Sequence, residues 1–454
     1  MNNILASNSS LRDMTWPSLT FQIIVIFIAA LFLIFILFST SDRTAAYPII
    51  KDSNRTAAAY PIIKDPNLKA EIVAEGIKFP TSMAFLDKDH ILVLEKNTGM
   101  VRMVANGQVQ PQPLLDLHVA NQGERGALGI VTVKNDNGSS YVFLYFTESS
   151  TGNDESNNLR VNYTLGNRLY RYEWVNNSLT DPRLLLDLPA APGPNHNGGN
   201  IEIGPDNNVY LSVGNLNDKQ LSSFYTKAEN INVEKEPDGR SGILRITQDG
   251  EVVLPTILGD EDPINKYYAY GIRNSFGMDF DPVTGRLWDT ENGPSYGDEI
   301  NLVEPGFNSG WFRVQGIWAP ADGLAGNTDL TPDNLINFDG KGKYSTPEFI
   351  WYQTVGPTEL EFLHSDKYGD QYENDLFVGD IKNGTLYHFD LNKARTDLYL
   401  RGPLIDKIAD NPKELGGIVF GEGFGGITDI ELGPDGYLYV LTAKLDKIFR
   451  IIPR

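Results

Sequence analysis

The sequence predicts an all-β protein, a six-bladed β-propeller preceded by an N-terminal transmembrane helix and a short stalk. Three observations lead to this prediction. From Glu71 onward, short β-branched and aromatic runs alternate with turns rich in Gly, Pro, Asn and Asp, and amphipathic helical patterns are scarce. One hairpin pattern recurs six times in this region. A long apolar run stands near the N-terminus, apart from the hairpins.

The apolar run extends without interruption from Ile23 to Phe38, and Phe21 lengthens it across Gln22 to about the thickness of a bilayer core. We therefore expect an N-terminal segment over residues 1–20 and a transmembrane anchor over residues 21–38. A cleaved signal peptide is the alternative, but the run exceeds a usual signal core and few charges precede it. Five Asn-x-Ser/Thr sequons fit an extracytoplasmic location for the remainder, at Asn54, Asn137, Asn162, Asn176 and Asn383.

A tandem repeat follows the apolar run. Residues 43–54 recur almost unchanged at residues 55–67, and each copy contains a Tyr-Pro step that favours extended backbone. We interpret residues 39–67 as a linker that holds the globular part away from the membrane, with a binding role for the repeat as the alternative. The propeller is then expected over residues 68–454.

The recurring unit is an apolar strand, a polar turn and a second strand. Two copies turn through Gly-Pro-Asp, a tripeptide that suits a tight reversal, so its aspartates are predicted to be turn residues rather than catalytic ones. A closed ring of such hairpins protects its sheet edges without disulfides. The six copies lie at residues 83–94, 130–146, 201–213, 278–289, 362–378 and 430–441.

Composition excludes several classes of function. Lys and Arg number 38 and Asp and Glu 59, a net charge of −21, which repels polyanions and makes nucleic acid an unlikely partner. The chain has no cysteine, so it forms no disulfide, thiolate metal site or cysteine nucleophile. Only five histidines are present, so any metal is expected to be a hard cation bound by oxygen.

Three loop segments combine residue types suited to a ligand. Residues 291–301 concentrate turn glycines, carbonyl-bearing residues and carboxylates outside a regular pattern, as expected of a loop that holds an ion or cofactor. Arg273 lies in Gly-Ile-Arg-Asn, which favours an anionic ligand over a surface ion pair. His196 precedes a predicted strand among small residues, where it is either a general base or merely hydrogen-bonded.

These loops resemble the soluble glucose/sorbosone dehydrogenase family, six-bladed propellers that oxidise sugars with pyrroloquinoline quinone (PQQ) and calcium. The resemblance covers roughly residues 73–452 and is strongest over residues 196–213 and 270–311. The resemblance implies that His196 takes the proton from the sugar's anomeric hydroxyl and that Arg273 acts beside the reactive quinone carbonyl. It also implies a cofactor site and two calcium sites. The cofactor would be bound by Arg273, Asn274, Lys382 and Glu124, its calcium by the carbonyls of Gly293 and Pro294, and a separate calcium by Glu299.

Five positions depart from that pattern. Asn215 stands where an aspartate would orient the histidine, and an amide cannot supply the charge that stabilises an imidazolium. Gly426 and Thr428 stand where two arginines would meet the carboxylates of PQQ. Ile272 and Asn292 replace histidines.

The function we expect is membrane-anchored, extracytoplasmic oxidation of aldose sugars to lactones, dependent on PQQ and calcium, with an electron acceptor that the sequence does not identify. The alternative is a non-catalytic, calcium-stabilised propeller that binds glycan or protein ligands, which Asn215, Gly426 and Thr428 favour. A third hypothesis is a propeller lactonase in which carboxylate-bound calcium carries the chemistry.

Overall fold

The structure is a computed structural model that describes residues 61–454 apart from 136–137, 155–163, 217–223, 318 and 321–330. The chain separates into a unit over Met1–Ala58 and a compact unit over Ala59–Arg454, and the fold below is that of the second unit. The predicted anchor at 21–38 and residues 39–60 of the predicted linker (39–67) lie outside the described residues. Within the described end of that linker, Ile62 and Ile63 form a short strand, β1, that pairs with β28 (Val419–Glu422). In the part that is described, no helix has the length and apolar character needed to cross a membrane.

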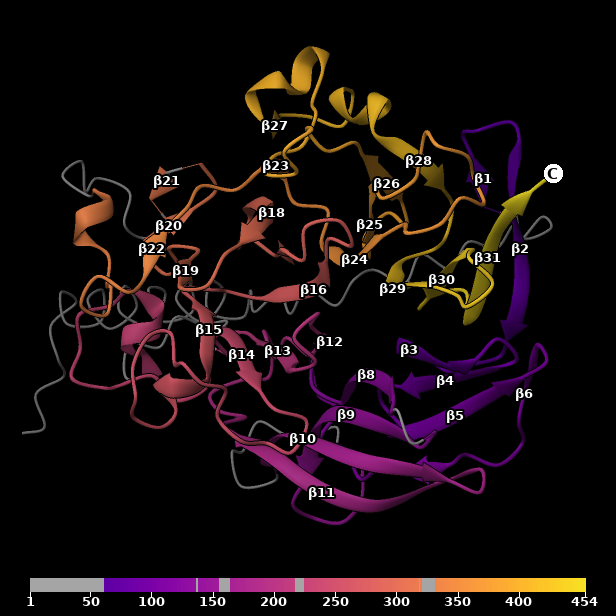
Figure 1. The fold of residues 1–454 in the computed structure, drawn as a ribbon, viewed down its shortest axis with the longest axis horizontal. Helices are drawn as coiled ribbons and strands as arrows, with labels where there is room; N and C mark the ends of the chain where they lie inside the picture. Colours follow the sequence, from indigo (N-terminus) through magenta and orange to yellow (C-terminus); the bar gives the residue numbers. More distant parts are fainter. Residues whose placement is uncertain (1–60, 136–137, 155–163, 217–223, 318, 321–330) are drawn as a thin grey trace, which may run out of the picture. The chain divides into compact units, whose positions relative to one another are not determined.

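The fold is an all-β propeller, as predicted. The described residues form six sheets of four to six strands each, together with one two-stranded sheet. Each of the six larger sheets has one innermost strand, and these strands contact one another in a ring. β3 contacts β8, followed by β12, β16, β24 and β29, and β29 contacts β3. Figure 1 shows the sheets fanning outward from this ring of inner strands.

Three of the larger sheets come from the first half of the domain. Their strands are β3 (Pro80–Asp87), β4 (His90–Glu95), β5 (Met100–Ala105), β6 (Gln108–Val109) and β7 (Leu115–Asp116); β8 (Ala127–Lys134), β9 (Ser140–Ser149), β10 (Thr164–Val175) and β11 (Ser178–Leu188); and β12 (Ile201–Ile203), β13 (Val209–Val213), β14 (Gly242–Ile246), β15 (Tyr267–Tyr270), β19 (Phe307–Asn308) and β22 (Lys343–Tyr344).

The other sheets come mainly from the second half. They contain β16 (Ser275–Phe280), β17 (Leu287–Glu291), β18 (Tyr296–Val303), β23 (Phe349–Gln353) and β27 (Ile408–Ala409); β24 (Pro357–Phe362), β25 (Leu376–Asp380), β26 (Leu386–Phe389), β28 (Val419–Glu422) and β1 (Ile62–Ile63); β29 (Ile427–Leu432), β30 (Leu438–Thr442), β31 (Lys447–Pro453) and β2 (Leu68–Glu75); and the pair β20 (Val314–Gln315) and β21 (Ala319–Pro320).

Short 3-10 turns interrupt the connections between strands. They are η3 (Lys227–Glu229), η4 (Ile264–Lys266), η5 (Pro332–Asn334), η6 (Gly402–Asp406) and η7 (Glu414–Gly417).

All six predicted hairpins are confirmed, and each forms the two inner strands of one larger sheet. The predicted role of the Gly-Pro-Asp aspartates as turn residues is also confirmed. Asp206 accepts hydrogen bonds from the backbone N of Asn208 at 3.2 Å and the hydroxyl of Tyr210 at 3.0 Å. Asp435 accepts the same pair from Tyr437 and Tyr439, at 3.3 and 3.0 Å. Each carboxylate therefore closes its turn.

The core lies between neighbouring sheets, and the alternation of side chains along a strand builds it. In β4, Leu92 and Leu94 pack against the sheet of β8 to β11, whereas Ile91 and Val93 pack against the sheet that ends the chain. A strand buried on both faces needs an unbroken apolar run, which the segment from Ile91 to Leu94 provides.

The ring closes by pairing the two ends of the domain. β2 joins β31 as an antiparallel neighbour, from Leu68 opposite Pro453 to Glu75 opposite Lys447. The last sheet therefore combines three C-terminal strands with one N-terminal strand, which removes an open edge from the ring.

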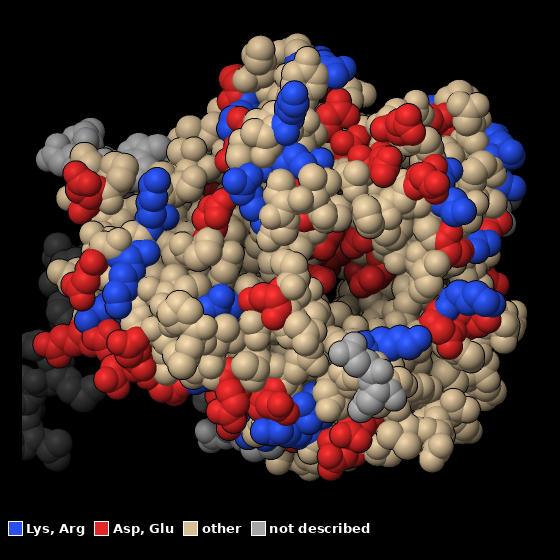
Figure 2. Space-filling model, viewed as in Figure 1, with Lys and Arg blue, Asp and Glu red and all other residues tan. Residues whose placement is uncertain are grey.

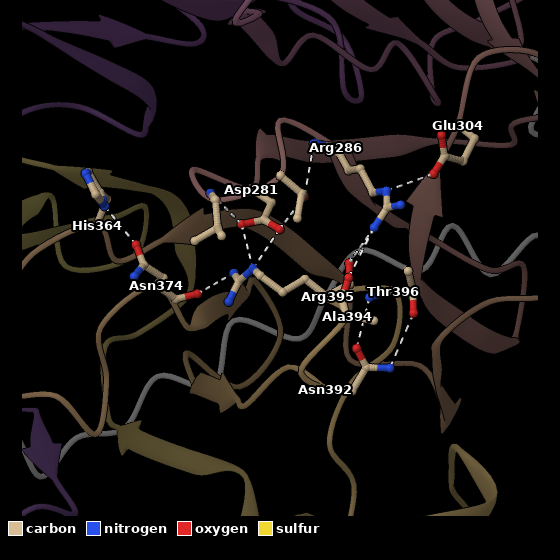
Figure 3. Close-up of polar contacts among 11 residues, drawn as sticks. Asp281, Arg286, Glu304, His364, Asn374, Asn392, Ala394, Arg395 and Thr396 are labelled. Carbon is tan, nitrogen blue, oxygen red and sulfur yellow. Dashed lines mark hydrogen bonds and ion pairs between the residues drawn. The ribbon is translucent and has the colours of Figure 1, made fainter.

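A buried ion pair joins a loop of one larger sheet to a turn of the sheet beside it. The Arg395 Nε donates to both carboxylate oxygens of Asp281 at 2.8 and 2.7 Å, and its Nη2 donates to the carbonyl of Asn374 at 2.6 Å. Figure 3 shows the guanidinium between these two acceptors. Asp281 is 0% exposed, so the pair fixes the loop after β26 against the turn after β16.

Candidate active site

The loop before β12 holds His196 in a buried, left-handed conformation. His196 is 6% exposed and has φ 60, and its backbone N donates to Glu124 Oε2 at 2.6 Å. The loop lies tightly on β13, since a Cβ at Gly198 would stand 2.4 Å from the carbonyl oxygen of Ser212. The small residues around His196 are therefore needed to seat the loop.

Behind His196, two side chains set the orientation of its ring. His196 Nδ1 lies 2.6 Å from Asn215 Oδ1, and Asn215 Nδ2 donates to Glu229 Oε1 at 3.4 Å. The amide nitrogen of Asn215 points at Glu229. Its oxygen therefore accepts a hydrogen bond from the N–H at Nδ1 of His196. The other ring nitrogen, Nε2, is then the unprotonated one. Glu229 was not predicted, because nothing in the sequence links the 3-10 turn η3 to His196.

The imidazole is held neutral. Burial, and secondly the nearby Arg273 guanidinium, lower the pKa of His196 to about 3, while the bond to Asn215 acts weakly the other way. Burial raises the pKa of Glu229 to about 7, although Arg240 opposes this. His196 is consequently uncharged over the whole physiological range, with a lone pair on Nε2.

Three of the predicted site residues meet at one carboxylate. Glu124 Oε2 accepts from the backbone of His196 and, at 3.4 Å, from Asn274 Nδ2, and Asn274 Oδ1 accepts from the backbone N of Gly198 at 3.2 Å. Lys96 adds a cation near Glu124, and burial lowers the pKa of this lysine to about 8. Glu124 is thus used to position the histidine loop against Asn274.

Hydrogen bonds to two neighbouring residues hold the backbone and the side chain of Arg273. Its backbone N donates to Glu291 Oε1 at 2.6 Å, and Nη1 donates to the carbonyl of Asn292 at 2.7 Å. The guanidinium also lies 5.5 Å from the ring centroid of Trp311. The two predicted catalytic residues are close together, because the backbone N of Asn215 donates to the carbonyl of Arg273 at 2.9 Å and that of Leu216 donates to the carbonyl of His196 at 3.3 Å.

The Gly293–Pro294 loop is pinned by Asp298. Asp298 Oδ1 accepts from the backbone N of Gly293 at 2.8 Å, and Oδ2 accepts from those of Val355 and Gly356 at 2.7 Å. A Cβ at Gly293 would lie 2.1 Å from the carbonyl oxygen of Tyr296, so the loop requires glycine there.

Lys382 approaches the same region from the neighbouring sheet. Its Nζ donates to the carbonyl of Thr354 at 2.9 Å. Burial raises the pKa of Asp298, and the charge of the nearby Lys382 opposes this increase. Lys382 therefore lies near the carboxylate that holds the Gly293 loop, and its role in cofactor binding stays a prediction.

Glu299 belongs to a buried carboxylate cluster that sequence reasoning largely missed. Glu299 and Glu291 are cross-strand partners on β18 and β17, and Asp289 lies two residues along. Burial raises the pKa of Asp289 to about 7. Burial, together with repulsion from neighbouring carboxylates, raises the pKa of Glu291 to about 8 and that of Glu299 well above its usual value. Three enclosed oxygens here have no hydrogen-bond partner in the structure, Asp289 Oδ2, Asn301 Oδ1 and Gln315 Oε1.

Acidic side chains also gather at the centre of the ring, where Figure 2 shows them in a hollow. Carboxyl groups of the inner strands β12, β16, β24 and β29 meet there. Burial raises the pKa of each of these groups, and repulsion among them adds to the effect at four of the six. The four are Glu202, Glu359, Glu361 and Glu431, and the other two are Asp279 and Asp429. The centre is thus unfavourable for an anion, and the cations Arg273 and Lys382 belong to the loops around it.

Two positions lack the charge that the resemblance would place there. Gly426 has φ +93, and Thr428 is buried with its hydroxyl donating to the carbonyl of Pro80 at 3.0 Å. Arg125 does not compensate, because it is buried under the histidine loop with its guanidinium on the carbonyl of Ala190.

Comparison with known proteins gives a consistent result. A family model described as glucose/sorbosone dehydrogenase matches residues 77–450. Aldose sugar dehydrogenase YliI of Escherichia coli is 25% identical over 408 residues, covering 85% of this chain and 93% of that protein. Quinoprotein glucose dehydrogenase B of Acinetobacter calcoaceticus is 26% identical over 267 residues, which are 54% of this chain and 52% of that protein.

The fold has solved counterparts. The structure of the PQQ-bound aldose sugar dehydrogenase of Streptomyces coelicolor superposes with a TM-score of 0.58 at 21% identity, covering 87% of this chain and 100% of that one. At this identity the likeness establishes the fold.

Proposed function

This chain belongs to the glucose/sorbosone dehydrogenase family, and we propose that it is a PQQ-dependent enzyme that oxidises aldose sugars to lactones. The observation that carries the proposal is the state of His196. Its ring is neutral, and Nδ1 is held by Asn215, so Nε2 is the nitrogen able to accept a proton.

Bound PQQ would supply the two-electron oxidant for the anomeric carbon of the sugar. His196 takes the proton of the anomeric hydroxyl at Nε2, and Asn215 holds the ring while the proton transfers. Without a carboxylate directly on Nδ1, the imidazolium formed is less stabilised than it would be beside an aspartate. Arg273 stands close enough to oppose that charge further, so the proton must leave His196 readily.

The residues present fit an anionic quinone. Arg273 and Lys382 bring two cations to the loops around Gly293, and Asn274 adds an amide whose orientation is set by Glu124 and Gly198. Glu124 acts mainly through the histidine loop, since its Oε2 accepts from His196 and Asn274.

Calcium is proposed at two places. Gly293 and Pro294 would offer backbone carbonyls beside the quinone, as the family resemblance implies. The cluster around Glu299 is supported by its unpartnered buried oxygens, because a cation of this kind takes six to eight oxygen ligands and offsets the repulsion among carboxylates.

We further propose that the six larger sheets are the six blades of the propeller, and that residues 21–38 anchor the enzyme in a membrane with the propeller on the extracytoplasmic side. The apolar run and the sequons support this arrangement. The electron acceptor would then be reached from that side.

His196→Ala tests the proposal. Loss of the base is expected to lower sugar-dependent dye reduction by about 10²-fold to 10⁴-fold, with PQQ binding and the melting temperature close to those of the wild type. The assay uses the full chain in detergent with PQQ, calcium and glucose. Equal rates in the variant and the wild type would remove His196 from the chemistry.

A calcium-stabilised binding propeller is the second candidate, favoured by the absence of cations at Gly426 and Thr428. It predicts that calcium raises the melting temperature although the wild type does not bind PQQ. Saturable PQQ binding by the wild type would exclude this candidate.

A further inference from the structure

A lysine that the family resemblance does not single out lies over Gly426. Lys444 follows β30 in the turn to β31, and its backbone N donates to the carbonyl of Gly425 at 3.3 Å. The neighbouring Ala443 N donates to the carbonyl of Gly426 at 2.9 Å. A Cβ at Gly426 would stand 3.6 Å from Lys444 Cε, so the lysine side chain passes within van der Waals distance of position 426.

The end of this side chain reaches the loop that carries Lys382. Lys444 Nζ donates to the carbonyl of Lys382 at 3.1 Å and to that of Ile381 at 3.4 Å. Lys382 Nζ in turn donates to the carbonyl of Thr354. The Lys444 ammonium is thereby held at the loop that carries Lys382, and these partners of the two ammonium groups are carbonyl and hydroxyl oxygens rather than carboxylates.

This arrangement leaves binding capacity for an anion. An ammonium group has three donors, and two of those on Lys444 are directed at carbonyls, at 3.1 and 3.4 Å. Lys444 is exposed, so its third donor faces solvent or a ligand. The carboxylates of Glu202, Glu359 and Glu431 lie on the inner strands, so an anion is repelled from the centre of the ring and favoured at these loops.

Gly426 is required for this placement. Its φ of +93 is strained for residues with a side chain, and a Cβ would also lie 2.8 Å from the carbonyl oxygen of Ile381. A cation can therefore reach this point from Lys444 but not from position 426 without distortion of the loop.

We propose that Lys444 binds a carboxylate of the quinone cofactor beside Lys382, the lysine that the family resemblance already implies, and supplies the positive charge that Gly426 and Thr428 lack. This inference rests on the proposed function, because it takes PQQ as the ligand. PQQ carries three carboxylates, and a charge-assisted bond from an ammonium is among the stronger polar contacts a protein makes.

The test is a titration of PQQ into the calcium-loaded full chain in detergent, followed by absorbance and fluorescence. Lys444→Gln is expected to weaken binding about tenfold or more, because one charge-assisted hydrogen bond is lost. Lys444→Arg is expected to restore most of the affinity. Lys413→Gln, which removes another exposed lysine, at the residue before η7, is the matched control and is expected to bind as the wild type does.

Each outcome is informative. Weakening in Lys444→Gln alone, with rescue by arginine, supports the inference. Equal affinity in Lys444→Gln and the wild type overturns the role of Lys444 and leaves the proposed function intact. Absence of PQQ binding by the wild type overturns both. A trimethyl ester of PQQ adds a readout of charge, because its affinity is expected not to change in Lys444→Gln.

Discussion

At the scale of single residues, the site is determined by how His196 is kept neutral and oriented. Burial and Arg273 lower the pKa of His196, and Asn215 holds its Nδ1 while being held itself by Glu229. The carboxylate of Glu229 therefore does not contact His196 directly. Asn215 lies between the two side chains. The result is a base that is available at all physiological pH values but has a low affinity for its proton.

Asn215→Asp tests this reading. A carboxylate 2.6 Å from Nδ1 favours the imidazolium, so the pKa of His196 is expected to rise by about one to three units from its value of about 3. Only the neutral imidazole is a base, so kcat/KM of the wild type should show no acid limb from His196 down to about pH 4, whereas the variant should acquire one at higher pH.

The direct measurement is a proton NMR titration of the histidine Cε1 signals, with His196→Ala to assign the resonance. An unchanged titration in Asn215→Asp would mean that the aspartate does not face His196, which would contradict the geometry of the site.

Sequence reasoning identified residues in loops with distinctive composition, such as His196 and Arg273, and the structure brings these two together. It could not identify Glu229 or Lys444, because each reaches the site from an element remote in sequence whose local pattern is ordinary. The departure at Asn215 was visible in the sequence, but its compensation by Glu229 depends on packing.

At the scale of elements, the hairpins could be predicted because each is encoded locally, by alternating or unbroken apolar runs around a turn. Long-range pairing is not encoded in this way, since β2 pairs with β31 across the whole length of the domain, which no local pattern specifies. The contact between Arg395 and Asp281 is likewise non-local.

Arg395→Ala is expected to lower the free energy of unfolding by about 3–5 kcal/mol, because it leaves the fully buried Asp281 carboxylate without its charge partner. Arg401→Ala is the matched control. Its ion pair with Asp390 spans 3.3 Å between exposed side chains, and its loss is expected to cost less than about 1 kcal/mol.

Urea unfolding of both variants measures the difference. Similar midpoints for Arg395→Ala and Arg401→Ala would show that the buried pair does not join the two sheets.

At the scale of the whole molecule, two clusters of carboxyl groups are enclosed in the ring, one at its centre and one around Glu299. The central carboxyl groups and the cluster at Glu299 are protonated or need a cation, since burial raises their pKa values. Sequence composition predicted attraction for cations in general, but the location of these clusters follows from how the strands converge.

Calcium is expected to raise the melting temperature of the wild type by several degrees, because a ligand at 100 times its Kd adds about 2.7 kcal/mol to stability. Glu299→Gln is expected to lose much of this gain, since it removes a charged ligand from the cluster. Glu304→Gln, an exposed glutamate next to the end of β18, is the matched control.

Differential scanning fluorimetry with and without calcium gives the comparison. A calcium response in Glu299→Gln as large as that of Glu304→Gln would place the stabilising ion elsewhere.

The most direct test of the central claim is a single-turnover reaction. The full chain, loaded with PQQ and calcium, is mixed anaerobically with glucose in the absence of an electron acceptor, and the quinone absorbance is followed. We predict sugar-dependent reduction of the bound quinone in the wild type and a rate lower by at least about 10²-fold in His196→Ala. A wild type that binds PQQ but shows no change in absorbance with any aldose would contradict the account.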